Sequence, residues 1–121
     1  MLHDTMPVVF VVSRDWTLRA AVRAELRETG VDTLGLETAE DVGKALARSV
    51  LPAVVVVDAA ELETPLARES LGNLAQTAAV LVVDSRTAPA PDLPGAARLQ
   101  RPVRVGDIVA CVLTLLAERT G

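Results

Sequence analysis

Four consecutive valines, residues 54–57, are followed directly by an aspartate, Asp58. Valine is β-branched and favours strands, and an unbroken apolar run of this length is typical of a strand buried on both faces. Strands of this kind lie at the centre of parallel sheets that carry helices on both sides. Open α/β sheets bind their ligands at the carboxyl ends of such strands. Asp58 is therefore the first candidate functional residue of the chain.

Two further apolar runs, residues 8–12 and 80–83, also end in polar residues. Because parallel strands present their carboxyl ends at one edge of the sheet, we expect the polar residues that follow the three runs to converge. They predict a pocket that is formed by Asp58 together with Ser13, Arg14, Asp15, Asp84 and Ser85.

The spacing of apolar residues along the rest of the chain indicates alternating helices and short strands. Between residues 84 and 95, three prolines disfavour a regular helix of more than a turn or two. The pattern predicts an α/β fold of three layers, with a five-stranded parallel sheet, right-handed crossovers and helices on both faces. We expect residues 1–121 to form a single domain. The predicted helices are 17–29, 39–49, 65–75 and a last helix that opens at Gly106 and Asp107; the further predicted strands are 31–36, 79–83 and 96–100.

The composition narrows the class of function. Twelve basic against sixteen acidic residues give a net charge of −4, and only Phe10 and Trp16 are aromatic. Neither a phosphate-backbone footprint nor a base-stacking surface is therefore expected. No apolar run approaches the roughly 18 residues of a membrane span, and the amino terminus lacks a secretory-signal pattern. We expect a cytoplasmic protein without nucleic-acid or membrane partners, whose single cysteine, Cys111, is a buried and inert thiol.

The order of elements, the chain length and the placement of polar residues resemble the receiver domains of two-component response regulators, over nearly the whole chain. The resemblance implies a flavodoxin-like sheet with strand order 2-1-3-4-5. It also implies that Asp58 stands at the phosphoacceptor position, and that Arg101 and Pro102 stand at the position of the family's Lys-Pro pair in the same pocket. In the family, an acidic pair after the first strand holds Mg²⁺ against the phosphoryl group, and a hydroxyl after the fourth strand bonds to that group.

The chain departs from the family pattern at most of these positions. Ser13 and Arg14 replace the acidic pair, and Asp15 offers a carboxylate only at the neighbouring position. Asp84 stands where the hydroxyl is expected, although Ser85 is adjacent. The helix between the fourth and fifth strands is shortened or irregular. The family's lysine and its aromatic switch residue are replaced by Arg101 and Arg98.

These departures change the expected charge balance of the pocket. Phosphoryl transfer to a carboxylate needs a divalent cation to neutralise the moving oxygens, and Mg²⁺ prefers carboxylate ligands. Arg14 brings a fixed positive charge in their place, and the planar fork of Arg101 suits carboxylates. We therefore hypothesise a self-neutralised quartet, in which Asp58 and Asp84 pair with Arg14 and Arg101.

Three interpretations of Asp58 follow: a vestigial acceptor site, a retained phosphoacceptor, or a strand-end residue that caps a loop.

The main hypothesis is a receiver-like module of two-component type that is degenerate in Mg²⁺-dependent phosphorylation and acts through protein–protein interaction. One alternative is a working response regulator phosphorylated at Asp58, with Asp15 as a rearranged Mg²⁺ ligand. The other is a small α/β enzyme that uses Asp58 and Asp84 for acid–base work, although flanking arginines should lower both pKa values.

Under the main hypothesis the protein is not an enzyme, and no catalytic residue, metal ligand or cofactor is assigned. Mg²⁺ is expected only if the phosphorylation alternative holds. The resemblance implies a protein partner, either a histidine kinase or an output protein. We expect that partner, or a second copy of the chain in a homodimer, to dock on the last helix and the fifth strand.

Overall fold

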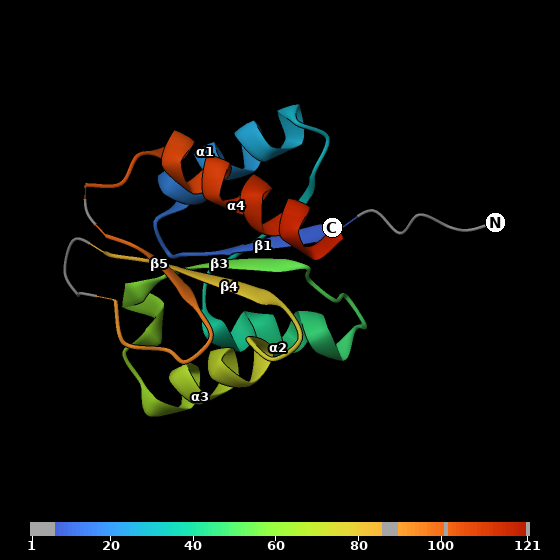
Figure 1. Cartoon of the computed structure of the whole chain (residues 1–121). Helices are drawn as coiled ribbons and strands as arrows, with labels where there is room; N and C mark the ends of the chain where they lie inside the picture. Colours follow the sequence, from blue (N-terminus) through green and yellow to red (C-terminus); the bar gives the residue numbers. More distant parts are fainter. Residues whose placement is uncertain (1–6, 86–89, 101, 121) are drawn as a thin grey trace.

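The computed structural model of the protein describes residues 7–85, 90–100 and 102–120. Strands and helices alternate along these residues, and a short 3-10 turn follows the third strand (Figure 1). The elements are β1 (Val8–Val12), α1 (Trp16–Glu28), β2 (Asp32–Leu36), α2 (Ala39–Ala47), β3 (Val54–Asp58), η1 (Ala59–Leu62), α3 (Pro65–Leu74), β4 (Ala79–Val83), β5 (Ala97–Leu99) and α4 (Val105–Thr120).

The five strands form one parallel sheet in the order β2-β1-β3-β4-β5. This confirms the predicted fold class and strand order, and it places the valine run of β3 at the centre of the sheet. The register pairs Val12 with Val57 and Asp58 with Val83. The chain segments that follow β1, β3 and β4 therefore leave the sheet at the same edge.

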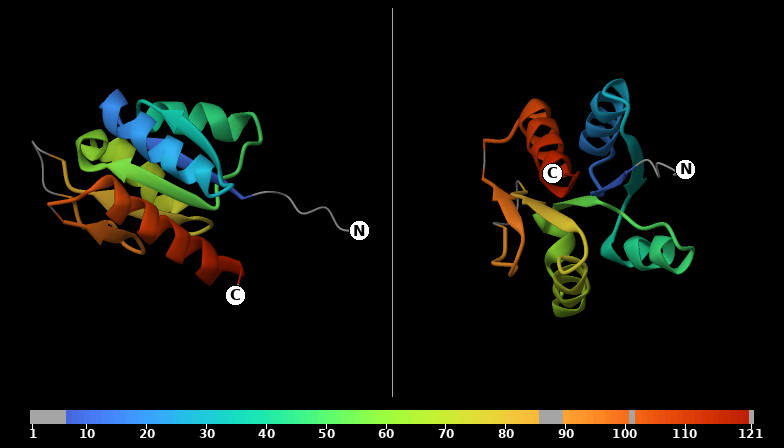
Figure 2. Two further views of the ribbon diagram at one scale, coloured as in Figure 1. Left: turned by 90° about the horizontal axis from the view of Figure 1, so that it is seen from above. Right: turned by 45° about the vertical axis from the view of Figure 1, so that its right-hand side comes forward.

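Helices α1 and α4 lie side by side on one face of the sheet, and α2 and α3 cover the other (Figures 1 and 2). The central strand contributes to both cores because its side chains alternate between the faces. Val54 and Val56 pack with α1 and α4, whereas Val55 and Val57 pack with α2 and α3. None of the four is more than 4% exposed, and full burial of a valine side chain is worth about 1.5–3 kcal/mol.

Local sequence signals fix several of the helix ends. Asp15 caps α1 by accepting hydrogen bonds from two backbone N–H groups of its first turn. Thr38 and Asp41 form a capping box at the start of α2. Gly30 ends α1 with φ at +84°, in the left-handed region that glycine adopts without steric cost.

The stretch between β4 and β5 carries no regular helix in its described residues, 84–85 and 90–96. This agrees with the prediction made from its prolines. Ala90 and Leu93 instead bury their side chains against the α2 and α3 side of the core. An irregular segment thus covers the apolar surface that a helix covers elsewhere on this face.

The other element bounds agree with the predicted ones to within one residue, and two features differ by more. Residues 59–62 form the 3-10 turn η1, where a loop was expected. Helix α2 ends at Ala47, two residues earlier than predicted, and Ser49 follows with φ at 65°. Within the described part of the chain, no helix is both long and apolar enough to cross a membrane.

Candidate functional site

Asp58, the last residue of β3, is half-buried and lies in a cavity of about 260 Å³. The cavity opens at the carboxyl edge of the sheet. It brings Asp58 together with three other predicted pocket residues, from the segments after β1 and β4, and with residues of η1 that the sequence did not indicate. The other lining residues are Arg14, Asp15, Ala60, Glu61, Glu63 and Ser85.

The carboxylate of Asp58 accepts hydrogen bonds from two neutral donors. The Ser13 hydroxyl donates to Oδ2 at 2.9 Å, and the backbone N–H of Ala60 donates to Oδ1 at 3.1 Å. The second bond makes Asp58 the N-cap of η1, so the structure bears out the capping role proposed for a strand-end aspartate. Each of the two oxygens therefore has one donor within the protein.

Ser13 is held in place by the segment around it. Its side chain is 1% exposed, and its Oγ accepts a hydrogen bond from the backbone N–H of Asp15 at 3.0 Å. The Arg19 guanidinium donates to the Ser13 carbonyl at 2.6 Å. A hydroxyl that is buried and fixed in this way has its proton aimed at Asp58.

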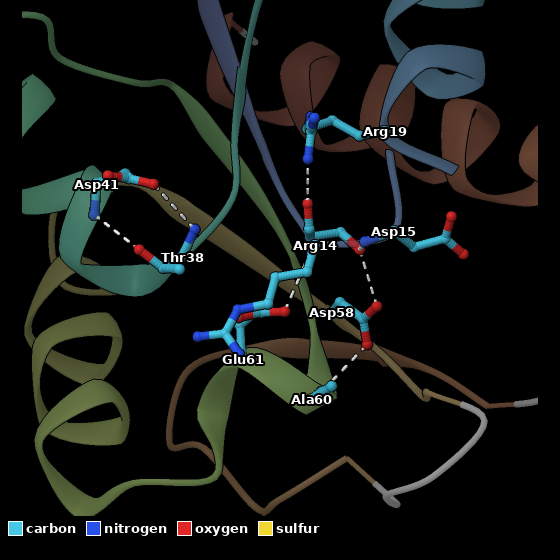
Figure 3. A network of polar contacts seen from close by, with 9 residues as sticks. Arg14, Asp15, Arg19, Thr38, Asp41, Asp58, Ala60 and Glu61 are labelled. Carbon is cyan, nitrogen blue, oxygen red and sulfur yellow. Dashed lines mark hydrogen bonds and ion pairs between the residues drawn. The ribbon is translucent and has the colours of Figure 1, made fainter. Parts of the chain in front are cut away.

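Arg14 forms its ion pair with Glu61 (Figure 3). Its Nε lies 3.3 Å from Oε1 of Glu61, and its backbone N–H donates to Oε2 at 3.2 Å. The Glu61 side chain is 4% exposed, whereas that of Arg14 is 73% exposed. The pair thus joins a buried carboxylate in η1 to a solvent-facing guanidinium in the segment after β1.

This pairing corrects the hypothesis of a neutralised quartet. Arg14 was expected to pair with Asp58, but in the structure its side chain extends to Glu61 (Figure 3). The reason is the turn η1, which brings Glu61 back against the backbone of Arg14. The Glu61 carboxylate therefore contacts both the backbone N–H and the Nε of Arg14. Arg101, the other expected cation, lies outside the described residues.

Burial is the dominant influence on Glu61. Desolvation raises the pKa of its carboxyl above the ordinary value, while the Arg14 N–H and the Arg14 guanidinium lower it by a smaller amount. The negative charges of Asp58 and Glu63 add to the increase in this pKa. The ion pair therefore offsets only part of the cost of burying this carboxylate.

Sequence reasoning did not identify Glu61 as a site residue. The one sequence feature that points to Glu61 is its spacing. It lies three residues after Asp58, in a stretch for which neither a helix nor a strand is predicted. A turn of 3-10 geometry places residues three apart on the same side, so recognising η1 would have pointed to Glu61.

The remaining predicted pocket residues occupy different positions. The Asp15 carboxylate caps α1 and points away from Asp58 (Figure 3). Asp84 accepts a hydrogen bond from the Ala90 N–H at 2.9 Å, which fastens the irregular segment after β4. Ser85 lines the Asp58 cavity, and Pro102 is exposed and does not line it.

Two further observations concern metal binding and the cysteine. Across the described ranges, no cluster of three or more His, Cys, Asp or Glu side chains is arranged to hold a metal ion. Cys111 is half-buried on α4, and burial raises the pKa of its thiol, with a further contribution from Glu118. This agrees with an unreactive thiol.

The sequence and the structure were compared with those of known proteins. No family model matches the sequence, and no curated protein matches it. The structure is similar to the signal receiver domain of a Luxo repressor protein from Vibrio parahaemolyticus, with TM-score 0.75 and 17% identity, covering 94% of this chain and 92% of that one. It is also similar to a CheY-like response regulator receiver domain protein from Methanospirillum hungatei, with TM-score 0.73 and 17% identity, covering 96% of this chain and 98% of that one.

A further similar structure is the lysine decarboxylase of Francisella novicida, with TM-score 0.69 and 16% identity. The match covers 96% of this chain but 18% of the decarboxylase. The fold therefore also occurs as one part of a much larger enzyme.

The fold is that of response regulator receiver domains, a flavodoxin-like α/β sandwich. Within that fold Asp58 stands at the end of the central strand, which is the phosphoacceptor position implied by the sequence resemblance.

Proposed function

We propose that the protein is a receiver-like signalling module that acts through protein–protein interaction and does not use Mg²⁺-dependent phosphorylation. The observation that carries this proposal is the pair of neutral donors, the Ser13 hydroxyl and the Ala60 N–H, on the two oxygens of Asp58. They hold the carboxylate without an added cation. Asp58 then acts as a structural link between β3 and η1 and not as an acceptor.

The residues around Asp58 do not fit Mg²⁺, which supports the same conclusion. Mg²⁺ takes near-octahedral oxygen ligands and is usually held by carboxylates. Ser13 and Arg14 stand where the family carries acids, and the exposed Arg14 guanidinium brings positive charge to the cavity rim. Asp15, the Mg²⁺ ligand expected under the phosphorylation alternative, caps α1.

Incubation with acetyl phosphate and Mg²⁺, followed by intact-mass measurement, tests the proposal. We expect no added phosphoryl group on the wild-type protein. In the variant Ser13→Asp/Arg14→Asp, which restores two carboxylates after β1, we expect Mg²⁺ binding. Trp16, 68% exposed beside this segment, serves as the fluorescence reporter. A mass gain on the wild type that Asp58→Asn abolishes would establish the working-regulator alternative in place of this proposal.

We further propose that a protein partner, a histidine kinase or an output protein, docks on α4 and β5. Leu113 of α4 is 37% exposed, and the flanking β5 lies at the edge of the sheet, where backbone groups are available for pairing. The same face suits a second copy of the chain. Sedimentation of the wild type and of Leu113→Glu over a range of concentrations distinguishes the two partners.

The proposal assigns no enzymatic activity to residues 1–121, taken as a single cytoplasmic domain. General acid–base catalysis needs each carboxylate to reach the proton that it transfers in one bound substrate. Asp58 instead caps η1, and Asp84 accepts the Ala90 N–H of its own segment.

A further inference from the structure

A groove of about 780 Å³ runs between α2 and α3, on the opposite side of the sheet from α4. Its apolar lining comes from both helices and includes a large side chain left open to solvent. Leu66, in the first turn of α3, is 73% exposed, while Val42 of α2 is 3% exposed and forms part of the floor. The apolar residues that line it are Ala39, Val42, Leu46, Ala60, Leu66 and Ala67.

The exposure of Leu66 follows from the way in which α3 begins. Thr64 caps the helix by accepting the Ala67 N–H, and Pro65 occupies its first position. This start fixes Leu66 at the mouth of the groove, whereas Leu71 and Leu74 turn into the core. Leu66 thus contributes apolar surface that the fold itself does not bury.

The lining of the groove carries excess negative charge. Glu40, Glu61 and Glu63 line it, and Arg14 is the single basic residue among the described lining residues. Arg14 is already paired with Glu61. The Glu40 carboxylate has Lys44 at 4.0 Å, but both side chains are at least 70% exposed, so this pair is weak. The net charge of the groove lining therefore favours a cation.

We propose that the α2–α3 groove binds a segment of a partner protein that carries an aliphatic or aromatic side chain next to a lysine or arginine. The apolar side chain covers Leu66 and Val42, and the cation lies against Glu63 and Glu40. A helix or extended segment laid in a groove of this type is a common mode of recognition. A small ligand fits less well, because such ligands are usually 70–90% buried and this groove is open at Leu66.

The groove also adjoins the Asp58 cavity. Arg14, Ala60, Glu61 and Glu63 line both spaces, so the Arg14–Glu61 pair forms the wall between them. A cation from the partner competes with Arg14 for Glu61 and thereby reaches the turn that Asp58 caps. This inference adds a second partner surface to the proposed function and rests on it only in treating the chain as an interaction module.

Selection of phage-displayed random peptides on the full chain tests the inference. We expect the enriched peptides to combine an apolar anchor with lysine or arginine. Binding of one such labelled peptide, followed by fluorescence anisotropy, is then compared between variants. Leu66→Ser and Glu63→Lys should each weaken binding by roughly tenfold.

Two matched controls separate the groove from general surface effects. Leu51 is 72% exposed and lies outside the groove, so Leu51→Ser should leave the affinity unchanged within roughly twofold. Glu69 is an exposed glutamate of α3 that does not line the groove, and Glu69→Lys should behave likewise.

Several outcomes would overturn the inference: no enriched peptide, enrichment of acidic or uncharged peptides, or equal effects of the groove and control substitutions. A concentration-dependent dimer that Leu66→Ser dissociates would assign the groove to a second copy and reject a separate partner. All four substitutions leave Asp58 and its donors in place. The acetyl phosphate experiment therefore reports on the proposed function independently of this result.

Discussion

The carboxyl edge of the sheet is organised differently at its two ends. At the β1–β3 end, Asp58, Ser13, Arg14 and Glu61 belong to one compact network that joins the segment after β1 to η1. At the β4–β5 end, Asp84 bonds to the N–H of Ala90, within the segment that immediately follows β4. Residues that converge at one edge of a sheet can therefore serve separate local structures.

The difference shows how charge is distributed in this pocket. The one ion pair of the described cavity residues serves Glu61, which is buried, while Asp58 is held by neutral donors. The Arg14 guanidinium thus stabilises the neighbouring Glu61 carboxylate and does not pair with Asp58. Four predictions test whether the two ends are as separate as these contacts indicate.

The largest expected effect is at Ser13. Ser13→Ala removes the donor to Asp58 and the acceptor of the Asp15 N–H at a position that is 1% exposed. We expect the free energy of unfolding to fall by about 1–3 kcal/mol in urea denaturation, because buried polar groups lose their partners. Ser70→Ala, at an exposed position of α3, is the control and should change it by less than about 0.5 kcal/mol. Equal effects would mean that the Ser13 contacts carry no stability.

A smaller loss is expected at Arg14. Arg14→Gln leaves the buried Glu61 carboxylate with the backbone N–H alone, but the guanidinium is 73% exposed and solvent screens the pair. We expect a loss of about 1 kcal/mol in the free energy of unfolding. Arg14→Lys retains the charge and should recover part of that loss. If Arg14→Lys is as unstable as Arg14→Gln, the contribution of Arg14 is not electrostatic.

At the other end of the edge, Asp84→Ala removes the acceptor of the Ala90 N–H. We expect a loss of about 0.5–1.5 kcal/mol in unfolding free energy. The double variant Ser13→Ala/Asp84→Ala should equal the sum of the single losses within about 0.5 kcal/mol if the two ends act independently. A larger coupling energy would show that the network extends across the edge.

The smallest expected effect is a pH dependence from Glu61. Because burial raises the pKa of this carboxyl in the folded protein, the folded state binds its proton more tightly than the unfolded state. The contribution of Glu61 to stability is therefore most favourable below the unfolded value near 4.5 and falls as pH rises through the raised folded pKa. Urea denaturation of the wild type and of Glu61→Gln across this range should show the variant gaining relative stability as pH rises. A gain as pH falls would indicate a lowered pKa.

Much of the fold could be predicted from the sequence, because β1, β3 and β4 are strongly β-favouring apolar runs and α1, α2 and α3 begin at clear capping residues. The valine run fixed β3 at the centre of the sheet, and Thr38 with Asp41 marked the start of α2. The proximity of Ser13 to Asp58 followed from the shared edge of parallel strands. The partner of Arg14 could not be predicted, since it depends on the short turn η1, whose geometry has no distinctive sequence pattern.

The double role of Asp58 has a mechanical consequence. One of its oxygens fastens the turn that carries Glu61, and its other oxygen is anchored to the first loop of the chain. A covalent change or protonation at this carboxyl would weaken one or both of these hydrogen bonds. Because η1 carries Glu61, the change would then reach the Arg14–Glu61 pair, which forms the wall between the Asp58 cavity and the α2–α3 groove. The Asp58 carboxyl is thus connected, through η1, to the wall of the α2–α3 groove.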